Sequence, residues 1–330
     1  MNHLNKIYVL GISMEKQKKI YVCTLTKEQS DQLRTLMEER GWEFDSMQYA
    51  YWRGKKDRTN VVSYESGKLK VDGSGTAEFV QYLLEPEILK EYRFGYEIEL
   101  AEIEHPDMFL PHAGIDESGK GEFFGPLVFA CCYIDGHDMA RRLLEAGVTD
   151  SKKYTTDNKV CTMANLVRKE VSGNFNIITL MPETYNRLYA SIGNLDRLMA
   201  WGHAKTLENV LEIVPSCPRA ISDQFDMTGQ AVPHALLERG KRIKLEQYPK
   251  AEADVAVAAA SILARAELIR RRMDLSEQLG IQLPKGADTK VVETAYLIAQ
   301  QGGAELLAKY AKMHFNIAKK ALEWLDEQYR

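Results

Sequence analysis

The sequence has few cysteines, no long apolar run and no excess of basic residues, and each shortage narrows the class of protein. Five cysteines without a Cys-x-x-Cys pair favour free, mostly buried thiols in a reducing compartment over a disulfide framework. No stretch approaches the roughly 18 apolar residues that a membrane span needs. The first residues show no signal-peptide pattern. A cytoplasmic location without membrane association is therefore expected, and no obligate protein partner is evident.

The net charge of −4 at pH 7 is unusual for a nucleic-acid-binding protein, which is basic overall in most cases. The charge is unevenly distributed, however. Residues 46–70 contain six basic side chains against Asp57 and Glu65, whereas residues 85–107 contain eight acids against Lys90 and Arg93. Since association is steered by the local field, a basic patch at 46–70 keeps nucleic acid open as a ligand.

The order of predicted elements indicates two domains within the 330 residues. Residues 1–85 read as strands at Lys6–Leu10 and Tyr21–Leu25, a helix over Thr26–Arg40, further strands and a second helix over Thr76–Leu84. Residues 86–111 are acidic and bounded by prolines, which is typical of a linker. Residues 112–330 predict an α/β domain, a mixed sheet of five strands with helices on both faces. Its strands are expected at Ala113–Glu117, Leu127–Ile134, Asn176–Met181, Arg219–Asp223 and Arg242–Leu245, and its helices at about Asn194–Val214, Glu252–Met273, Lys290–Gln301 and Tyr310–Glu327.

The stretch from Gly114 to Pro126 carries the clearest chemistry in the chain. Asp116 and Glu117 are adjacent carboxylates that run directly into a glycine-rich turn, and an apolar strand follows. Carboxylates beside a buried strand are costly unless a cation holds them, and a divalent metal ion is the usual cation. Glycines let the backbone approach a ligand closely. The pattern therefore predicts a metal site beside a substrate surface.

Two further acids stand at the ends of predicted elements. Asp223 ends a strand, and Glu252 begins a helix rich in small residues. Four oxygen donors without His or Cys select Mg²⁺ or Mn²⁺ over zinc. Two such ions about 4 Å apart serve phosphodiester hydrolysis. Taken singly, each acid also has an ordinary interpretation: a solvated surface group, a strand-end turn, or a helix cap in the case of Glu252 or Asp254.

Further motifs along the chain, taken together, resemble those of a known enzyme family. The segment 114–126, Asp150-Ser151-Lys152 and the runs 189–209, 222–225, 250–261, 283–287 and 312–315 together resemble bacterial ribonuclease HIII over about residues 113–320. The resemblance of residues 1–85 to the small TATA-binding-protein-like domain of that family is weaker. Taken over the whole chain, the resemblance implies a ribonuclease H-like α/β fold, a five-stranded mixed sheet flanked by helices, with a small N-terminal α+β domain.

The resemblance also implies roles for single residues. The family's four catalytic, metal-binding acids fall on Asp116, Glu117, Asp223 and Glu252, with two Mg²⁺ or Mn²⁺ ions in the substrate complex. Asp254 is the alternative fourth acid, because the fourth acid of the sister family ribonuclease HII is an Asp and Asp254 lies two residues after Glu252. The implied activity is cleavage of the RNA strand of RNA–DNA hybrids. The turn whose backbone contacts the ribose 2′-hydroxyl would be Gly119, Lys120 and Gly121.

Other substrate contacts follow from charge. Ser151, Lys152 and Lys153 are candidates for phosphate contacts, with a solvated turn as the alternative. The first domain would bind the hybrid through its basic stretch, with the alternative that its aromatic residues are core and its lysines merely solvated. Its candidates are Arg53, Lys55, Lys56, Arg58, Tyr64 and Lys68. His203 and His314 are interpreted as structural.

Three functions remain in competition. The leading one is a metal-dependent endoribonuclease on RNA–DNA hybrids that leaves 5′-phosphate and 3′-hydroxyl ends. A ribonuclease HII-like enzyme would instead incise DNA duplexes at single ribonucleotides. A hybrid-binding protein without catalysis would keep the fold alone. The presence of all four acids, Asp116, Glu117, Asp223 and Glu252, argues against the last of these.

Overall fold

The computed structural model describes residues 19–225 and 228–328, so the strand expected at Lys6–Leu10 lies outside the described residues. The chain divides into two compact units after Ala101. In the described part of the chain, no helix is long and apolar enough to cross a membrane. All five cysteines are free thiols, and three of them are buried, as the sequence predicts.

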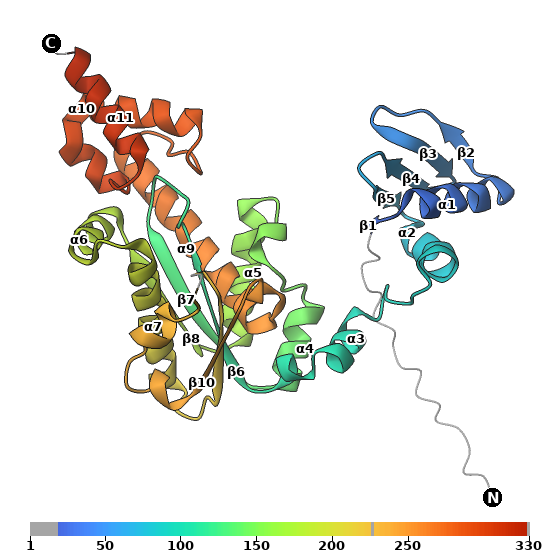
Figure 1. Ribbon diagram of the computed structural model, residues 1–330, viewed down its shortest axis with the longest axis horizontal. Helices are drawn as coiled ribbons and strands as arrows, with labels where there is room; N and C mark the ends of the chain where they lie inside the picture. The colour runs from blue at the N-terminus through green and yellow to red at the C-terminus, as the bar shows by residue number, and fades with distance from the viewer. Residues whose placement is uncertain (1–18, 226–227, 329–330) are drawn as a thin grey trace, which may run out of the picture. The chain divides into compact units, whose positions relative to one another are not determined.

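The first unit is a five-stranded antiparallel sheet in the order β1-β5-β4-β3-β2, with its helices packed on one face (Figure 1). Thr26 begins α1 with a capping box, in which its hydroxyl and the Gln29 side chain satisfy two free backbone amides. The elements are β1 (Ile20–Thr24), α1 (Lys27–Glu39), β2 (Glu43–Asp45), β3 (Ala50–Lys56), β4 (Thr59–Tyr64), β5 (Lys68–Gly73), α2 (Thr76–Phe79) and the π-helix η1 (Val80–Leu89).

The end of the first unit lies further along the chain than the predicted boundary at residue 85. The second helix was expected to span Thr76–Leu84, but it continues through Pro86 as the π-helix η1 and ends at Lys90. Ile88 and Phe94 are buried in the core of this unit. The predicted acidic linker 86–111 therefore contains core residues of the first unit, the helix α3 (Glu97–Glu104) and the 3₁₀ turn η2 (Pro106–Phe109).

The second unit is built on a mixed five-stranded sheet in the order β10-β9-β6-β7-β8, as predicted (Figure 1). β7 pairs antiparallel with both β6 and β8, while β9 pairs parallel with both β6 and β10. The strands are β6 (His112–Ser118), β7 (Leu127–Ile134), β8 (Phe175–Leu180), β9 (Arg219–Asp223) and β10 (Lys244–Tyr248). The helices are α4 (His137–Glu145), α5 (Asp157–Glu170), α6 (Pro182–Ile192), α7 (Leu195–Ile213), α8 (Ala231–Ala235), α9 (Val255–Leu279), α10 (Thr289–Tyr310) and α11 (Asn316–Gln328).

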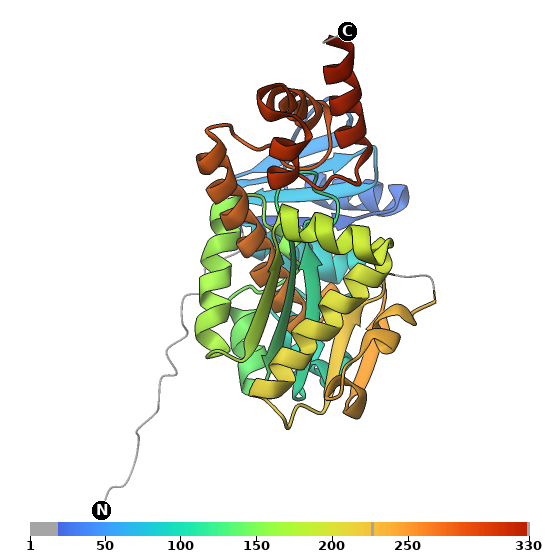
Figure 2. The ribbon, with the colours of Figure 1, turned by 90° about the vertical axis from the view of Figure 1, so that its left-hand side faces the viewer.

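Two long helices cover opposite faces of this sheet (Figure 2). α7 packs on the face that carries Ala113 and Ile115, and α9 packs on the other. α9 lies against the backbone of β6, because a Cβ atom at Gly114 would come within 2.1 Å of the carbonyl carbon of Ala256. The run of small residues in α9 thus brings this helix onto the sheet as closely as the sequence predicts.

Several element boundaries differ from the predicted ones. The helix predicted from Glu252 begins at Val255, because Asp254 caps it and residues 251–253 form a separate 3₁₀ turn, η5. The strand predicted at Arg242–Leu245 is shifted by two residues or more to β10. α10 extends past the predicted end at Gln301 to Tyr310, with a kink at Gly302 and Gly303.

Candidate active site

A groove of about 590 Å³ lies at the end of β6 where the two adjacent acids stand. Asp116, Glu117 and Asp223 line one part of it, and the glycine turn lines another. The remaining wall comes from η3 (Ser151–Lys153), the start of α5, α9 and the loop after α9; its residues include Ser151, Lys152, Asp157, Ser261, Arg265, Leu268, Ile269, Arg272, Lys285 and Gly286. The strand ends, the glycine turn and the helices α5 and α9 therefore meet at one groove.

Asp116 and Glu117 are neighbours in β6, so their side chains point to opposite faces of the sheet. Asp116 lies on the α9 side, where Ser261 donates a hydrogen bond to it. Glu117 lies on the α7 side, where Nε2 of the buried His203 donates to Oε2 of Glu117 at 2.9 Å. The other ring nitrogen of His203 is 2.9 Å from the hydroxyl of Ser222. Each acid is thus supported by a different layer of the fold.

The electrostatics of the two acids differ accordingly. Burial and the charge of Glu117 raise the pKa of Asp116 well above its usual range, although Ser261 opposes the shift. Burial also acts to raise the pKa of Glu117, but the hydrogen bond and charge of His203, with Lys120 and Lys152, outweigh it and leave that pKa lowered. The pair therefore holds one ionised carboxylate and one that resists ionisation.

The other two predicted acids approach from strand β9 and turn η5. The backbone amide of Ala251 donates to Oδ1 of Asp223 at 3.4 Å. Burial, together with the charges of Glu252 and Glu117, raises the pKa of Asp223 despite that bond. Glu252 has 22 % of its side chain exposed, and its Oε1 lies 3.6 Å from Nζ of Lys152. The four predicted acids are therefore coupled electrostatically, and three of them line the groove.

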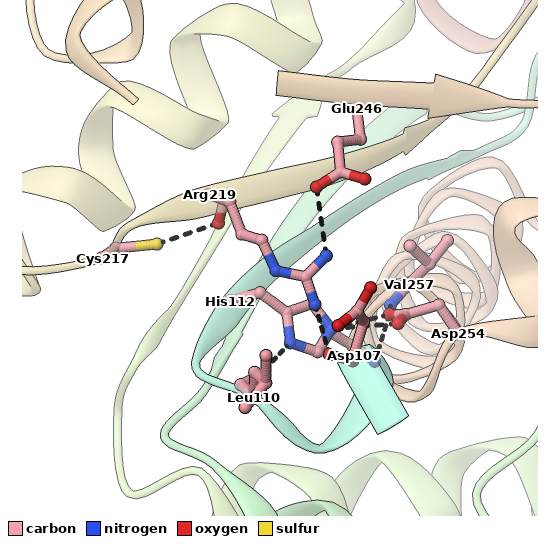
Figure 3. A network of polar contacts seen from close by, with 9 residues as sticks. Asp107, Leu110, His112, Cys217, Arg219, Glu246, Asp254 and Val257 are labelled. Carbon is pink, nitrogen blue, oxygen red and sulfur yellow. Dashed lines mark hydrogen bonds and ion pairs between the residues drawn. The ribbon is translucent and has the colours of Figure 1, made fainter. Parts of the chain in front are cut away.

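Asp254, the alternative fourth acid, has a different environment (Figure 3). Its Oδ1 accepts hydrogen bonds from the backbone amides of Ala256 and Val257, so it caps α9. Both carboxylate oxygens lie 3.0 Å from Nε2 of His112, and the exposed fractions of these two side chains are 6 % and 0 %. Nδ1 of His112 is 2.6 Å from the carbonyl oxygen of Leu110. Asp254 is thus engaged in joining α9 to the start of β6.

This junction belongs to a wider polar network at the far end of β6 (Figure 3). Arg219 donates from Nη1 to Oε1 of Glu246 at 3.2 Å and from Nη2 to the carbonyl of Asp107. The thiol of Cys217 lies 3.2 Å from the carbonyl oxygen of Arg219. The network ties β9 and β10 to the segment that leads into β6.

The donor set at the groove suits a hard divalent cation. Residues 19–225 and 228–328 contain no group of three or more His, Cys, Asp or Glu side chains already arranged to hold a metal ion. Asp116, however, is a carboxylate whose ionisation is opposed by burial and by Glu117, which is the condition that a bound cation relieves. The oxygen donors of Asp116, Glu117, Asp223 and Glu252 fit Mg²⁺ or Mn²⁺ by ligand type.

The glycine turn beside the acids leaves its backbone open to a ligand. Gly119 has φ +98°, and a Cβ atom there would lie 2.4 Å from the carbonyl oxygen of Pro126, so the fold itself requires glycine. At Gly121 a Cβ atom would meet nothing within 4 Å, so the fold does not require glycine there. Lys120, between them, places its ammonium 5.4 Å from the ring centre of Phe225. At Gly121, unlike Gly119, the lack of a side chain serves to keep the groove accessible to a close-fitting ligand.

The three predicted phosphate contacts in η3 have separate environments. Ser151 lines the groove, but it is buried and its hydroxyl lies 2.8 Å from that of Ser261, so it supports the residue that binds Asp116. Lys152 is 76 % exposed at the groove. Lys153 donates to the hydroxyl of Thr149 at 3.1 Å and does not line the groove. Lys152 is the residue of the three that is placed to meet a ligand there.

The basic stretch of the first unit is divided between two places. The strand register puts Arg53, Lys55, Tyr64 and Lys68 on the sheet face opposite the helices. Lys56 and Arg58 instead line a separate hollow of about 500 Å³ at the β3–β4 turn. Asp45 pairs with both Arg53 and Lys55 on the open face.

Sequence reasoning missed the support of the acids. His203 was set aside as structural, and it is buried, but its structural role is to orient Glu117. Ser261 was noticed as part of a small-residue face, whereas its hydroxyl binds Asp116. In the sequence nothing marks either residue beyond its motif, because both partners lie more than eighty positions away.

The chain is similar to a family model and to several known proteins. The family model described as ribonuclease HII matches residues 113–318. Ribonuclease HIII of Chlamydia pneumoniae is 39 % identical over 295 residues, which cover 89 % of this chain and 95 % of that protein. Ribonuclease HIII of Chlamydia caviae is 34 % identical over the same shares of the two chains. The crystal structure of Bst-RNase HIII in complex with Mn²⁺ superposes with a TM-score of 0.60 at 29 % identity, covering 92 % of this chain and 98 % of that one.

Glu252 in turn η5 and Asp254 at the N-terminal cap of α9 allow a paired prediction. Asp254→Asn should lower the melting temperature, because it weakens a buried pair with His112 and a helix cap, with an expected cost of about 1–3 kcal/mol. Glu252→Gln should leave the melting temperature near that of the parent but weaken Mn²⁺ binding at least tenfold. Thermal unfolding and calorimetric Mn²⁺ titration of both variants measure this. A weaker Mn²⁺ affinity for Asp254→Asn alone would reverse the assignment.

Proposed function

Because the chain belongs to the ribonuclease HII and HIII family, we propose that it hydrolyses the RNA strand of RNA–DNA hybrids and leaves 5′-phosphate and 3′-hydroxyl ends. The observation that carries this proposal is the pair Asp116 and Glu117, held at the end of β6 beside an open glycine turn in one groove. A carboxylate pair of this kind suits metal-assisted phosphodiester hydrolysis. The enzyme is thus a type 2 ribonuclease H.

The similarity to ribonuclease HIII favours a uniform hybrid as substrate over a single ribonucleotide in DNA. The family model for ribonuclease HII matches only residues 113–318, whereas the ribonuclease HIII relatives match 89 % of the chain. Their alignment therefore includes most of the first unit. Incision at single ribonucleotides is the alternative outcome of the substrate test below. The proposal also includes the cytoplasm as the place of action, for which the free thiols are the support.

The residues that would hold two Mg²⁺ or Mn²⁺ ions are Asp116, Glu117, Asp223 and Glu252. Such ions, when bound, activate water and stabilise the charge that develops on the phosphate. The protein contributes the orientation of the ligands: Ser261 holds Asp116, His203 holds Glu117, and the amide of Ala251 holds Asp223. Asp254 is already committed to capping α9 and to His112, which supports Glu252 as the fourth ligand.

Lys152 is proposed to contact the substrate phosphate. Partial burial acts to lower its pKa, but the charges of Glu252, Asp150 and Asp116 raise it, so the ammonium stays protonated. This ammonium lies 3.6 Å from Oε1 of Glu252 and partly neutralises the acids. Since cations at the acids would compete with it, Lys152 would then be released toward the phosphate in the groove.

The glycine turn is proposed to read the ribose. The backbone of Gly119, Lys120 and Gly121 lines the groove next to Asp116, and the open space at Gly121 admits a sugar. The 2′-hydroxyl is the group that distinguishes RNA from DNA at a single site, and it both donates and accepts hydrogen bonds. Recognition by main chain would make the enzyme selective for ribose without selecting the base.

Substitution of Asp116 tests the metal assignment. Asp116→Asn should reduce cleavage of a uniform RNA–DNA hybrid at least 100-fold in Mg²⁺ or Mn²⁺, because it removes a charged ligand while keeping the shape. Without metal its melting temperature should equal or exceed that of the parent, since a carboxyl group whose ionisation is opposed by burial and by Glu117 is replaced by a neutral amide. The rise in melting temperature on adding Mn²⁺, seen in the parent, should be lost. Activity within tenfold of the parent would contradict the assignment.

The substrate test uses the parent protein with Asp116→Asn as its control. Three duplexes are compared in Mg²⁺ and in Mn²⁺: a uniform RNA–DNA hybrid, a DNA duplex with one ribonucleotide, and plain DNA. We expect cleavage of the hybrid that exceeds incision at the single ribonucleotide, and no cleavage of plain DNA. A preference for the single ribonucleotide would establish the ribonuclease HII-like activity. Tight hybrid binding without cleavage in either metal would leave a binding protein only.

The first unit is proposed to supply affinity through the open face of its sheet. Lysine contacts to phosphate release counterions, so removing two of them should flatten the salt dependence of binding by about two units of log Kd per log salt. We expect this of Lys55→Gln with Lys68→Gln, which lie on the open face. Lys56→Gln with Arg58→Gln, at the separate hollow, is the matched control and should change the slope by less than half as much. Equal slopes for both pairs, measured by fluorescence anisotropy, would exclude the open face.

A further inference from the structure

Lys312 is a completely buried lysine in the segment between α10 and α11, with 0 % of its surface exposed. Its ammonium donates to the carbonyl oxygen of Glu122 at 2.7 Å and to that of Gly125 at 2.9 Å. Its backbone amide donates to the carbonyl oxygen of Phe123 at 3.0 Å. One residue thus satisfies three carbonyl groups of a single loop, the loop that follows the glycine turn.

Such a lysine is expensive to bury. Removal from water lowers the pKa of Lys312 to about 7, against the opposing charge of Glu122. Its partners are neutral carbonyl groups and the ring of Tyr185, whose centre is 5.7 Å from the ammonium. An apolar side chain of the same length would fill this site without burying a charge. Packing alone therefore does not account for a lysine here, whereas the geometry of the carbonyl groups does.

The loop that Lys312 holds is continuous with the turn in the groove. The amide of Glu122 donates to the carbonyl of Gly119 at 3.2 Å, which closes the turn. Beyond it, the amide of Phe123 donates to Gly286 at 3.0 Å, and the amide of Gly125 donates to Tyr310 at 2.9 Å. The side chain of Glu122 also accepts from the amide of Gly286 at 2.9 Å. The start of the turn is fixed by β6, and its end is fixed from these two distant segments.

In the segment that begins at Tyr310, the side chain of Lys312 reaches two carbonyl groups of the loop. Phe123 and Phe124 are both buried, with ring centres 4.7 Å apart, so the apolar part of the loop has little freedom. The polar part, from Gly119 to Glu122, has glycine at two of its four positions and lines the groove. Loss of the ammonium would therefore be felt first in the part of the loop that faces a ligand.

We propose that Lys312 is a positioning residue for substrate recognition: its ammonium fixes the carbonyl groups of Glu122 and Gly125 and thereby sets the backbone of Gly119–Gly121 against the ribose of the RNA strand. This assignment rests on the proposed function for the identity of the substrate. The positioning of the turn itself is a property of the protein alone, and it can be measured without substrate.

The test compares Lys312→Met with Lys309→Met in the full chain. Methionine keeps the length and apolar volume of the lysine stem but cannot donate, while Lys309 is an exposed lysine on α10 and serves as the matched control. In Lys312→Met we expect amide hydrogen exchange of residues 119–125 to rise at least tenfold, with exchange in β7 unchanged. At saturating Mg²⁺, kcat on the hybrid should fall about tenfold or more. The Mg²⁺ concentration for half-maximal activity should stay within twofold of the parent, because the acids are untouched.

Lys312→Gln provides the graded variant, since its amide can donate but is shorter and uncharged, and it carries the test if the methionine variant does not fold. It should fall between the parent and Lys312→Met in both exchange and kcat. Parent-like amide exchange at residues 119–125 in a folded variant would overturn the proposal. So would a loss of activity accompanied by a more than twofold rise in the Mg²⁺ concentration for half-maximal activity. If the parent itself fails to cleave the hybrid, the proposed function fails, whereas the exchange comparison still decides whether Lys312 holds the turn.

Discussion

The contact between α9 and the backbone of β6 is the constraint on which the site depends. Gly114 allows the approach, since any side chain there would overlap the backbone of Ala256. The approach places Ser261 beside Asp116, and it places the cap of the same helix against His112. Glu252 stands in the short turn just before that cap. A helix held a few tenths of an ångström further away would loosen all of these contacts together, so one packing distance controls the geometry of chemically separate groups.

The site balances this tight packing against electrostatic strain. Asp116 resists ionisation because it is buried next to Glu117, and Asp223 does so because of burial and its neighbouring acids. Lys152 and His203 relieve part of the repulsion, one from an exposed side chain and one from the core. A protein selected for stability alone would replace such acids with amides. Their retention indicates that the unfavourable charge is relieved in another state, of which a cation-bound state is the simplest.

Much of the second unit could be predicted from the sequence because its signals are local. The apolar run of β7 and the end of β9 at Asp223 were predicted to the residue, and the glycine turn marked the site. The start of α9 was misplaced by three residues, because Glu252 and Asp254 are both acids at a helix start and only burial tells them apart. The helix predicted to end at Leu84 continues through Pro86 as a π-helix. The partners of Glu117 and Asp116 depend on contacts between distant segments, which no local pattern records.

The loop that follows the glycine turn is anchored by a residue that is synthesised late. Gly125 and Lys312 are 187 positions apart, so all four acids leave the ribosome well before the lysine that anchors the loop beside them. Domains fold as they emerge, from the N-terminal side first. The sheet and its acids can thus assemble on a nascent chain while the neighbouring turn is still unanchored. The groove is therefore complete only after the segment between α10 and α11 packs against the loop, so the site depends on one of the last parts of the chain to be synthesised.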